Sequence, residues 1–353
     1  VLNNPNGNNV TTTYPNVTSY TASLRVRTNT GCLSPLVTRT VVINPKPVPN
    51  FSNTFACLPD GVVNFTDNST ISDGSQSLFT YQWNFGNPPA GTLNTSGIRN
   101  PSHKYATVGP FDVKLIVTSN RQCVDSITRR ISNIFPQPKT NFNAPAEVCF
   151  QTPVTFTDQT NGITHPVNRW EWRFKDAAGS VVGSSTVRDP IFNFPAPGTY
   201  TVQHWAFTNQ NCVSDTVEKT IIINPWPTAS FTLSNPACEK NQVVLSSTSS
   251  PNAGTLVRWY WNLGDGTIIN ATAGTPVTHT YANWGNKPIK MLVESSKGCR
   301  SDTLRQPILI NPLPKVGYIL PEVCLTDGQA TFFDTSKIAD GSAAQLRYLW
   351  TFN

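Results

Sequence analysis

The sequence feature that most constrains the fold is a tryptophan that recurs at a fixed interval. Trp83, Trp172, Trp261 and Trp350 are separated by three equal steps of 89 residues. Each has an aromatic residue two positions before it and Phe or Leu two positions after it. Apolar residues at every second position form one buried face of a β-strand, and a strand that returns at a fixed period belongs to a repeated unit. The four tryptophans therefore predict the same core strand in four copies of one fold.

A second marker, two prolines separated by one residue, closes each repeat. The pairs are Pro45/Pro47, Pro136/Pro138, Pro225/Pro227 and Pro312/Pro314. Runs of β-branched residues precede three of them, and proline cannot donate to a β-ladder. Each pair therefore predicts the end of a strand and a stiff junction. The pairs are 91, 89 and 87 residues apart, which suits a small β-sandwich.

Between these markers, each repeat consists of short alternating segments separated by turn signals, without a helical period. The predicted fold class is all-β, with tandem Ig-like β-sandwich domains in an extended rod. We name the whole repeats I (46–136), II (137–225) and III (226–312). Residues 1–45 carry only the later markers of a repeat, and residues 313–353 carry only the earlier ones. We expect them to be the C-terminal and N-terminal parts of two further domains, in a section of a longer array.

Composition narrows the functional classes. The 26 Lys and Arg residues against 20 Asp and Glu give a net charge of +6 spread over 353 residues, which argues against a nucleic-acid partner. No apolar run approaches the ~20 residues that cross a bilayer, so we expect no membrane span in this segment. None of the eight cysteines forms a C-x-x-C pair. This argues against zinc and thioredoxin-like sites and indicates an oxidising, extracytoplasmic compartment.

The cysteines fall into two series by their place in the repeat. The turn before the last strand holds Cys32, Cys123, Cys212 and Cys299. The segment before the second strand holds Cys57, Cys149, Cys238 and Cys324. Pairing neighbours in sequence gives Cys32–Cys57, Cys123–Cys149, Cys212–Cys238 and Cys299–Cys324. Pairing within a repeat gives Cys57–Cys123, Cys149–Cys212 and Cys238–Cys299. Pairing across a junction gives Cys57–Cys212 and Cys149–Cys299.

Geometry and simple counting favour different pairings. Bonded cysteines have Cα atoms within about 7 Å of each other. The two series lie at opposite tips of a sandwich, and a ten-residue strand is roughly 34 Å long. This favours pairing across a junction in an extended rod, with the four remaining cysteines bonded to partners outside this segment. Pairing of neighbours instead uses all eight cysteines, and it stays open.

No arrangement typical of catalysis stands out, so we expect no enzyme activity and no cofactor. His103 and His279 hold the same repeat position, where repeat II has Phe192. Since phenylalanine cannot act as a general base, this is a packing position. His204 lies in the inward register of its strand, as a core or rim residue. Asp265, in a Gly-Asp-Gly turn, is the strongest candidate for calcium, although capping of its own turn is the commoner role of such an aspartate.

Several motifs together resemble the PKD (polycystic kidney disease) domain. Trp261–Gly266 reads Trp-Asn-Leu-Gly-Asp-Gly and is followed by a Pro-x-x-His-x-Tyr run. Asn100–Tyr105 and Gly198–Val202 match the later Asn-Pro-x-His-x-Tyr and Gly-x-Tyr-x-Val parts of that signature. The resemblance covers nearly the whole chain and implies PKD-type β-sandwiches. Asn84 and Asn262 replace the usual Asp, which weakens the expectation of calcium binding.

Tandem PKD domains with cysteines at these positions look like the large surface proteins of Bacteroidota, which include gliding-motility adhesins exported by type IX secretion. The resemblance implies a non-catalytic extracellular stalk or adhesin on a bacterial cell surface. Its partners would be other repeats of the same long chain and a surface glycan or protein. It also implies O-glycosylation of an Asp-Ser/Thr-aliphatic pattern at Ser126, Thr216 and Thr303, for which the start of a β-strand is the alternative explanation. The alternative functions are a PKD spacer of a secreted polysaccharide- or protein-degrading enzyme and a passive surface-filament subunit.

Overall fold

The computed structural model describes residues 9–322 and 328–352. This part of the chain consists of short β-strands and three 3-10 helices. The chain divides into two compact units, and the division passes through repeat II. Unit 1 comprises Val1–Asn141, Thr160–Trp170 and Trp205–Thr216, and unit 2 comprises Phe142–Gln159, Glu171–His204 and Val217–Asn353.

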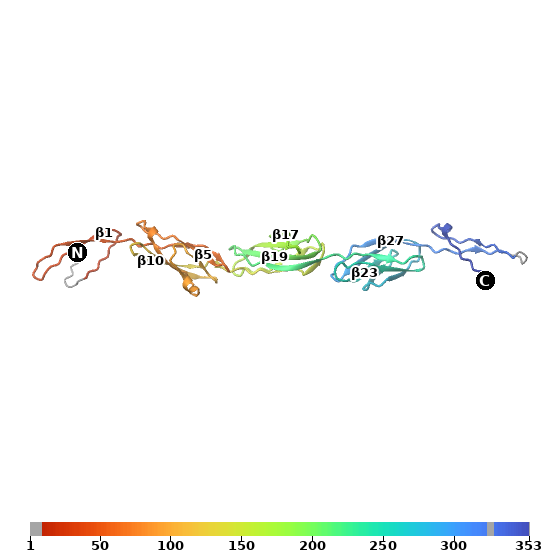
Figure 1. Cartoon of the computed structure of the whole chain (residues 1–353), viewed down its shortest axis with the longest axis horizontal. Coiled ribbons are helices and arrows are strands. Elements are labelled where there is room, and N and C mark those ends of the chain that lie inside the picture. The colour runs from red at the N-terminus through yellow and green to blue at the C-terminus, as the bar shows by residue number, and fades with distance from the viewer. Residues whose placement is uncertain (1–8, 323–327, 353) are drawn as a thin grey trace. The chain divides into compact units, whose positions relative to one another are not determined.

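Unit 1 begins with a β-hairpin and continues with the two sheets of repeat I. In the hairpin, β1 (Ser19–Leu24) pairs antiparallel with β2 (Val37–Val42). Repeat I has a three-stranded sheet of order β3-β5-β8, a four-stranded sheet of order β10-β9-β6-β7 and a short parallel pair, β11-β4 (Figure 1). Its elements are β3 (Phe51–Asn53), β4 (Ala56–Cys57), β5 (Val62–Asp67), η1 (Gln76–Leu78), β6 (Thr80–Asn84), η2 (Pro88–Asn94), β7 (Thr95–Ser96), β8 (Ser102–Lys104), β9 (Phe111–Thr118), β10 (Val124–Ile131) and β11 (Ile134–Phe135).

The core of repeat I forms where the inward faces of these sheets meet. Alternation along β9 buries Val113, Leu115 and Val117 and leaves the residues between them more exposed. Trp83 of β6 is fully buried and contacts Phe51 of β3, with ring centroids 5.2 Å apart. Full burial of one such large apolar side chain contributes about 1.5–3 kcal/mol. The period-2 pattern around the tryptophan thus produces the main contact between the two sheets.

Repeat II is built around a five-stranded sheet of order β13-β20-β19-β16-β17, of which Figure 1 labels β17 and β19. Two short pairs, β12-β15 and β14-β18, complete it. In unit 2, Trp172 is fully buried and lies against Phe142 and Phe156. The strands are β12 (Phe142–Asn143), β13 (Glu147–Cys149), β14 (Val154–Thr155), β15 (Thr157–Asp158), β16 (Val167–Lys175), β17 (Val181–Ser185), β18 (Ile191–Phe192), β19 (Gly198–Thr208) and β20 (Val217–Asn224).

Repeat III, also in unit 2, has the same two-sheet plan as repeat I. A three-stranded sheet of order β21-β22-β25 faces a four-stranded sheet of order β24-β23-β26-β27, and Figure 1 labels β23 and β27. Trp261 is 3% exposed and its ring centroid lies 5.3 Å from that of Phe231. The strands are β21 (Phe231–Leu233), β22 (Gln242–Ser247), β23 (Leu256–Asn262), β24 (Ile268–Ala271), β25 (Val277–Thr280), β26 (Gly285–Ser295) and β27 (Leu304–Ile310).

The described residues after repeat III form only the beginning of a sandwich. They contain β28 (Tyr318–Ile319) paired with β29 (Phe333–Asp334), and η3 (Ala343–Gln345). The strand expected around Trp350 is absent, and this tryptophan is 40% exposed. The physical reason is that β9 and β26, which pair with the tryptophan strands of repeats I and III, have no counterpart among the described residues 313–322 and 328–352.

The fold class is therefore the predicted one: an all-β chain of tandem Ig-like β-sandwiches. The part of the chain that the structure describes holds no helix with the length and apolar character required to cross a bilayer.

Candidate functional site

The turn before the last strand has one geometry in all its copies. The backbone N–H four residues before each cysteine donates to that cysteine's carbonyl group, at 2.9 Å for Thr28 and Cys32. The same bond is 2.9 Å long before Cys123, 3.0 Å before Cys212 and 2.9 Å before Cys299. A repeated tight turn therefore presents each cysteine at the same tip of its sandwich.

The second cysteine series is fixed beside the end of the last strand of its own repeat. Cys57 lies in β4, which runs parallel to β11, and Cys149 lies in β13, which runs parallel to β20. Cys238 forms a parallel bridge with Asn311. Each of these cysteines therefore lies next to the point where the chain leaves for the following repeat.

Two disulfides connect neighbouring repeats. Cys57 of repeat I is bonded to Cys212 of repeat II, with Cα atoms 5.4 Å apart. Cys149 of repeat II is bonded to Cys299 of repeat III, with Cα atoms 5.5 Å apart. This is the pairing across a junction; neither pairing of sequence neighbours nor pairing within a repeat occurs among the described cysteines.

The remaining described cysteines carry free thiols. Cys32 is exposed, whereas Cys123 and Cys238 are half-buried. Cys324 lies outside the described residues. Cys32 and Cys123 lie in the turn before the last strand, and Cys238 lies in the segment before the second strand. Each observed disulfide joins one cysteine of each series, and the free thiols include cysteines of both.

In unit 2, polar contacts surround the Cys149–Cys299 bond. The Lys297 ammonium group lies 2.9 Å from Glu147 Oε2, and Asn224 Nδ2 donates to the same carboxylate at 3.1 Å. These two hydrogen bonds, first that of Lys297, lower the pKa of Glu147. The carboxylate therefore stays ionised at neutral pH and aligns the turn of repeat III with β13 of repeat II.

An indole adds a packed contact to the same junction. Trp226, between the two prolines of the junction, donates from Nε1 to the Phe150 carbonyl at 2.9 Å. Its ring centroid lies 5.9 Å from that of Phe150. We name Glu147, Phe150, Trp226 and Lys297, together with the Cys149–Cys299 bond, the II–III clamp. Local sequence patterns could not predict the Glu147–Lys297 ion pair, because its partners are 150 residues apart.

In unit 1, the tip segments of repeat II meet the end of repeat I. Beside the Cys57–Cys212 bond, Gln137 Nε2 donates to Asp215 Oδ1 at 3.1 Å. The Phe135 and His165 rings lie edge to face, with centroids 4.7 Å apart. Both described junctions between whole repeats therefore combine a covalent bond with polar and aromatic contacts.

The aspartate after the second strand anchors the core in several repeats. Asp67 accepts a hydrogen bond from the Tyr81 hydroxyl at 2.9 Å and from Arg99 at 3.2 Å. Burial, and then the bond to Asp67, raises the pKa of Tyr81 to about 12. In repeat III the corresponding residue is Ser247, which accepts from Trp259 Nε1 at 3.0 Å. The position serves as a structural anchor in these repeats.

Repeat II uses a buried histidine at this anchor. His204 is completely buried, and its Nε2 lies 3.1 Å from Asp158 Oδ1. Its Nδ1 lies 3.0 Å from the Glu171 carbonyl oxygen, and its ring stacks on Trp172 at 3.7 Å. The inward register predicted the burial of His204, but not its pairing with Asp158, 46 residues away.

His103 behaves as the predicted packing residue. Its ring stacks on Phe85 with centroids 4.4 Å apart, as Phe192 stacks on Phe174 at 4.0 Å. Burial lowers the pKa of His103, so the ring is neutral at pH 7. Asn87 Nδ2 lies 3.0 Å from its Nε2.

The turn proposed for calcium is occupied by its own hydrogen bonds. His279 Nε2 lies 2.7 Å from Asp265 Oδ2, and the Thr267 N–H donates to Asp265 Oδ1 at 3.0 Å. Partial burial raises the pKa of Asp265, but these hydrogen bonds outweigh that effect and lower it. Residues 9–322 and 328–352 contain no cluster of three or more His, Cys, Asp or Glu residues suited to a metal. Calcium binding at this turn stays a prediction.

The three candidate glycosylation residues lie on the surface. Ser126 is in β10, while Thr216 and Thr303 directly precede β20 and β27, and all three are exposed. Exposure of these side chains is compatible with O-glycosylation, and equally with the alternative that the pattern marks the start of a β-strand. O-glycosylation at these residues stays a prediction.

None of the curated proteins matches the sequence. Among solved structures, the PKD1 domain of Vibrio anguillarum Epp is 22% identical, covering 25% of this chain and 95% of that domain, with a TM-score of 0.22. The PKD1 domain of the Vibrio cholerae metalloprotease PrtV is 27% identical, covering 24% of this chain and 96% of that domain, with a TM-score of 0.21. A tetra-tandem repeat from the extending region of a large adhesion protein is 12% identical, covering 83% of this chain and 82% of that one, with a TM-score of 0.27.

The sequence model of the PKD domain family matches residues 44–132 and 224–309, which correspond closely to repeats I and III. The disulfides and these matches indicate an extracellular or secreted protein. Together with the shared sandwich plan and the periodic tryptophans, they support a tandem array of PKD-type domains.

Proposed function

We propose that this chain is a non-catalytic stalk segment of an extracellular adhesin, which holds an adhesive part away from the surface that carries it. The observation that carries the proposal is the covalent closure of both described junctions between whole repeats. Short proline-rich linkers alone leave neighbouring domains some freedom to rotate. A disulfide beside each linker adds a second covalent connection, which a spacer under tension needs.

The finer parts of the proposal concern the biological setting. We place the stalk on a bacterial cell surface, in a Bacteroidota adhesin that is exported by type IX secretion and acts in gliding motility. The PKD matches and the oxidised junctions support an extracellular setting, and the resemblance of the repeats supports the rest. The domain boundaries 46–136, 137–225 and 226–312 are part of this proposal.

Single-molecule stretching of the purified 353-residue chain tests the mechanical part. With both disulfides closed, the shortest covalent path between the ends crosses from Cys57 to Cys212, returns along the chain to Cys149 and crosses to Cys299. This path contains about half of the residues of the chain, and each residue spans at most roughly 3.3–3.6 Å when the chain is fully extended. We therefore expect the final extension about to double when a reductant is added. Equal extension with and without reductant would reject a covalently clamped stalk.

Adhesion is tested in the source organism. Deletion of residues 46–312 from the surface protein leaves the remaining sequence in place but shortens the stalk. We expect weaker attachment of cells to glass, and we expect the Cys149→Ser/Cys299→Ser variant to retain attachment at rest and lose it under flow. Unchanged attachment after the deletion would contradict the stalk function.

Glycosylation is tested on protein from the same source. Intact peptides that contain Ser126, Thr216 and Thr303 should each carry an added glycan mass. Unmodified masses at all three positions would remove glycosylation from the proposal without affecting the stalk.

A further inference from the structure

A groove of about 490 Å³ lies in repeat III beside the II–III clamp. Its walls are the junction segment 226–229 and the segment 301–305, which includes the start of β27. Trp226 and Leu304 are half-buried there, whereas Asp302 and Arg305 are exposed. The volume falls within the range of about 300–1,000 Å³ that is typical of ligand pockets.

In repeats I and II, the chain itself occupies the aspartate at this place. The middle residue of the Pro-x-Pro pair lies next to the aspartate that follows the cysteine turn. In repeat I, Lys46 Nζ lies 3.5 Å from Asp125 Oδ2. In repeat II, Gln137 Nε2 donates to Asp215 Oδ1 at 3.1 Å. The aspartate therefore has an N–H donor beside it in both repeats.

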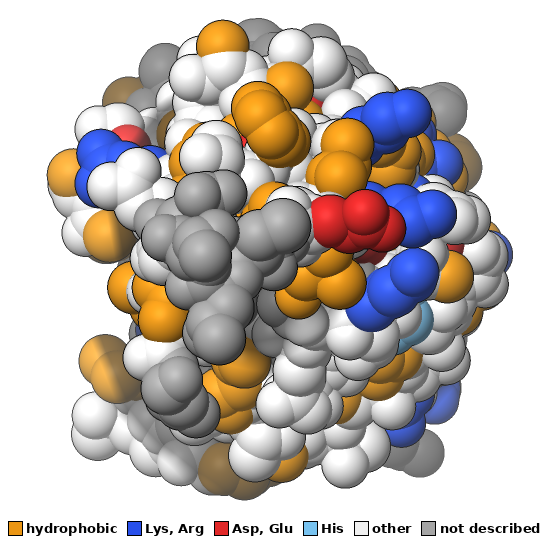
Figure 2. All heavy atoms as spheres, turned by 90° about the vertical axis from the view of Figure 1, so that its right-hand side faces the viewer, with side chains coloured by type: hydrophobic (Ala, Val, Ile, Leu, Met, Phe, Trp, Pro, Cys, Tyr) orange, Lys and Arg blue, Asp and Glu red, His pale blue; other side chains and the backbone are white. Residues whose placement is uncertain are grey.

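Repeat III lacks this contact, because its middle residue is a tryptophan with another role. Trp226 donates from Nε1 to the Phe150 carbonyl and lies against the Phe150 ring, as part of the clamp. Asp302, which corresponds to Asp125 and Asp215, has neither a hydrogen bond nor an ion pair in the part of the chain that the structure describes. Acidic side chains are few among the hydrophobic and uncharged ones on the face that Figure 2 shows, so an unpaired carboxylate is a distinct feature of this surface.

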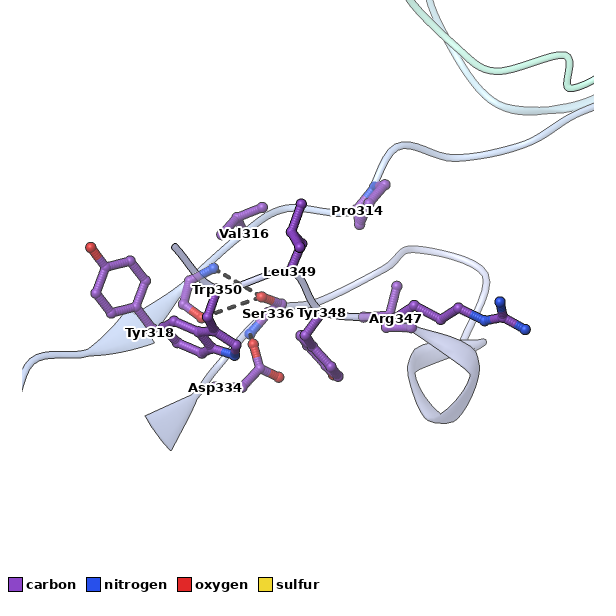
Figure 3. Close-up of a pocket in the computed structure, with 11 residues that line it drawn as sticks. Pro314, Val316, Tyr318, Asp334, Ser336, Arg347, Tyr348, Leu349 and Trp350 are labelled. Atoms are coloured by element: carbon purple, nitrogen blue, oxygen red, sulfur yellow. Dashed lines mark hydrogen bonds between the residues drawn. The ribbon is translucent and has the colours of Figure 1, made fainter. Parts of the chain in front are cut away.

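A second surface pocket shows the more usual state of such a carboxylate. This pocket is drawn in Figure 3, and its lining includes Tyr318, Asp334 and Trp350. Asp334 accepts a hydrogen bond from the Ser336 N–H at 3.0 Å. That carboxylate is engaged within the chain, whereas Asp302 is available to a ligand.

The groove of repeat III also holds a cation. Arg305 lines it, and within the described residues no hydrogen bond or ion pair engages its guanidinium group. The groove therefore offers a carboxylate that attracts an ammonium group and a guanidinium group that pairs well with a carboxylate. A ligand with several ammonium groups and no acid suits it less, because Arg305 repels the additional positive charge.

We propose that this groove binds an exposed segment of a partner protein that carries a lysine and, two positions away, an acidic residue. Lys46 and Asp125 of repeat I are the model for the first contact, since a lysine ammonium group meets the corresponding aspartate there. In the groove, the partner's ammonium group pairs with Asp302, and its methylene groups pack on the indole of Trp226. Side chains two positions apart lie on one side of an extended segment, so the acid can reach Arg305.

This inference goes beyond the stalk function and does not depend on it. A stalk needs closed junctions, whereas the groove makes repeat III a place of attachment. The clamp accounts for both features, because the bond of Trp226 to Phe150 leaves Asp302 uncovered.

Nuclear magnetic resonance with the purified, oxidised 353-residue chain tests the proposal. The chain carries isotope-labelled tryptophan and is made in a host without O-glycosylation, so that Thr303 is unmodified. The probe is the peptide acetyl-Lys-Gly-Glu-amide. The indole N–H signal of Trp226, identified by its loss in Trp226→Gln, should shift and saturate, while the signals of the other tryptophans stay unchanged. We expect a dissociation constant on the order of 1–10 mM, because exposed charge pairs are individually weak.

Variants of the protein and of the peptide separate the contacts. Asp302→Asn should weaken binding about fivefold, the upper end for an exposed ion pair. Asp215→Asn is the matched control and should bind as the wild type does, because Gln137 already occupies that carboxylate. Acetylation of the peptide's lysine removes its charge and should weaken binding by a similar factor. Trp226→Gln copies repeat II, so the introduced glutamine should occupy Asp302 and weaken binding, as measured at the backbone amide of Thr303 in uniformly labelled protein.

Three results would overturn the proposal. One is a Trp226 signal that does not shift or does not saturate, which excludes the groove as the site. Another is equal affinity of the peptide for the wild type and Asp302→Asn. The third is binding of spermidine, which has no carboxylate, as tightly as the peptide, because the ligand would then be a free polyamine.

Discussion

At the scale of single residues, the repeats act as natural substitutions of one another. His103 and Phe192 stack on equivalent phenylalanines, so the structure contains both versions of one packing position. His204 of repeat II and Met291 of repeat III also hold equivalent positions. His204 contacts the Asp158 carboxylate in the core, whereas Met291 is buried in an apolar core. Predictions for individual residues can therefore copy a side chain that another repeat already uses.

The first such prediction concerns pH. Burial lowers the pKa of His103 in the folded chain. Below about pH 6.5, the unfolded chain therefore binds a proton at this histidine more strongly than the folded chain does. Repeat I should therefore lose stability as pH falls from about 6.5 through the lower folded pKa. His103→Phe should remove this part of the pH dependence while changing stability at pH 8 by no more than about 1.5 kcal/mol. Thermal unfolding of wild type and variant at pH 5 to 8 measures the difference, and parallel pH profiles would contradict it.

The second prediction concerns the buried pair of repeat II. His204→Met removes the histidine that is hydrogen-bonded to the Asp158 carboxylate, and loss of a buried hydrogen-bond partner costs about 1–3 kcal/mol. Adding Asp158→Ser copies the Met291 and Ser247 pair of repeat III and should recover most of that loss. Chemical denaturation of the single and double variants gives the coupling energy. Additive effects of the two substitutions would show that the pair does not act as a unit.

At the scale of elements, the cysteine turns and the tryptophan strands could be predicted because each depends on a local pattern. A period of two gives the strand, and recurrence at 89 residues identifies it in each repeat. The parallel pairs β4–β11 and β13–β20 could not be predicted. Strands of two or three residues carry no periodicity, and tertiary packing decides their partners. The Glu147–Lys297 contact was unpredictable for a related reason, since it forms only when two repeats meet.

The II–III clamp gives a prediction at this scale. In a Cys149→Ser/Cys299→Ser variant, the remaining ion pair is exposed, and exposed pairs are weak in water. The amides of β13 and of the turn around Lys297 should exchange hydrogen faster, while those of β23 and β26 in the core should be unchanged. Cys238→Ser, which removes a free thiol, is the matched control and should match the wild type. Equal exchange in the clamp of variant and wild type would show that the disulfide does not hold the junction.

At the scale of the whole molecule, the repeat period predicted a chain of sandwiches, and the structure contains them. The two disulfides turn the linkers between whole repeats into double connections. An extended arrangement of the repeats is the prediction that links this covalent pattern to the function as a stalk.

Small-angle X-ray scattering of the oxidised chain tests this central claim most directly. Three whole sandwiches in line, each adding about 35–40 Å, give a length of at least about 105 Å and a radius of gyration of about 30 Å or more. A compact chain of the same 353 residues has a radius of gyration of about 20 Å. We measure at low concentration, so that association does not enlarge the value. A radius of about 30 Å or more is the predicted result, and a radius near 20 Å would contradict the account.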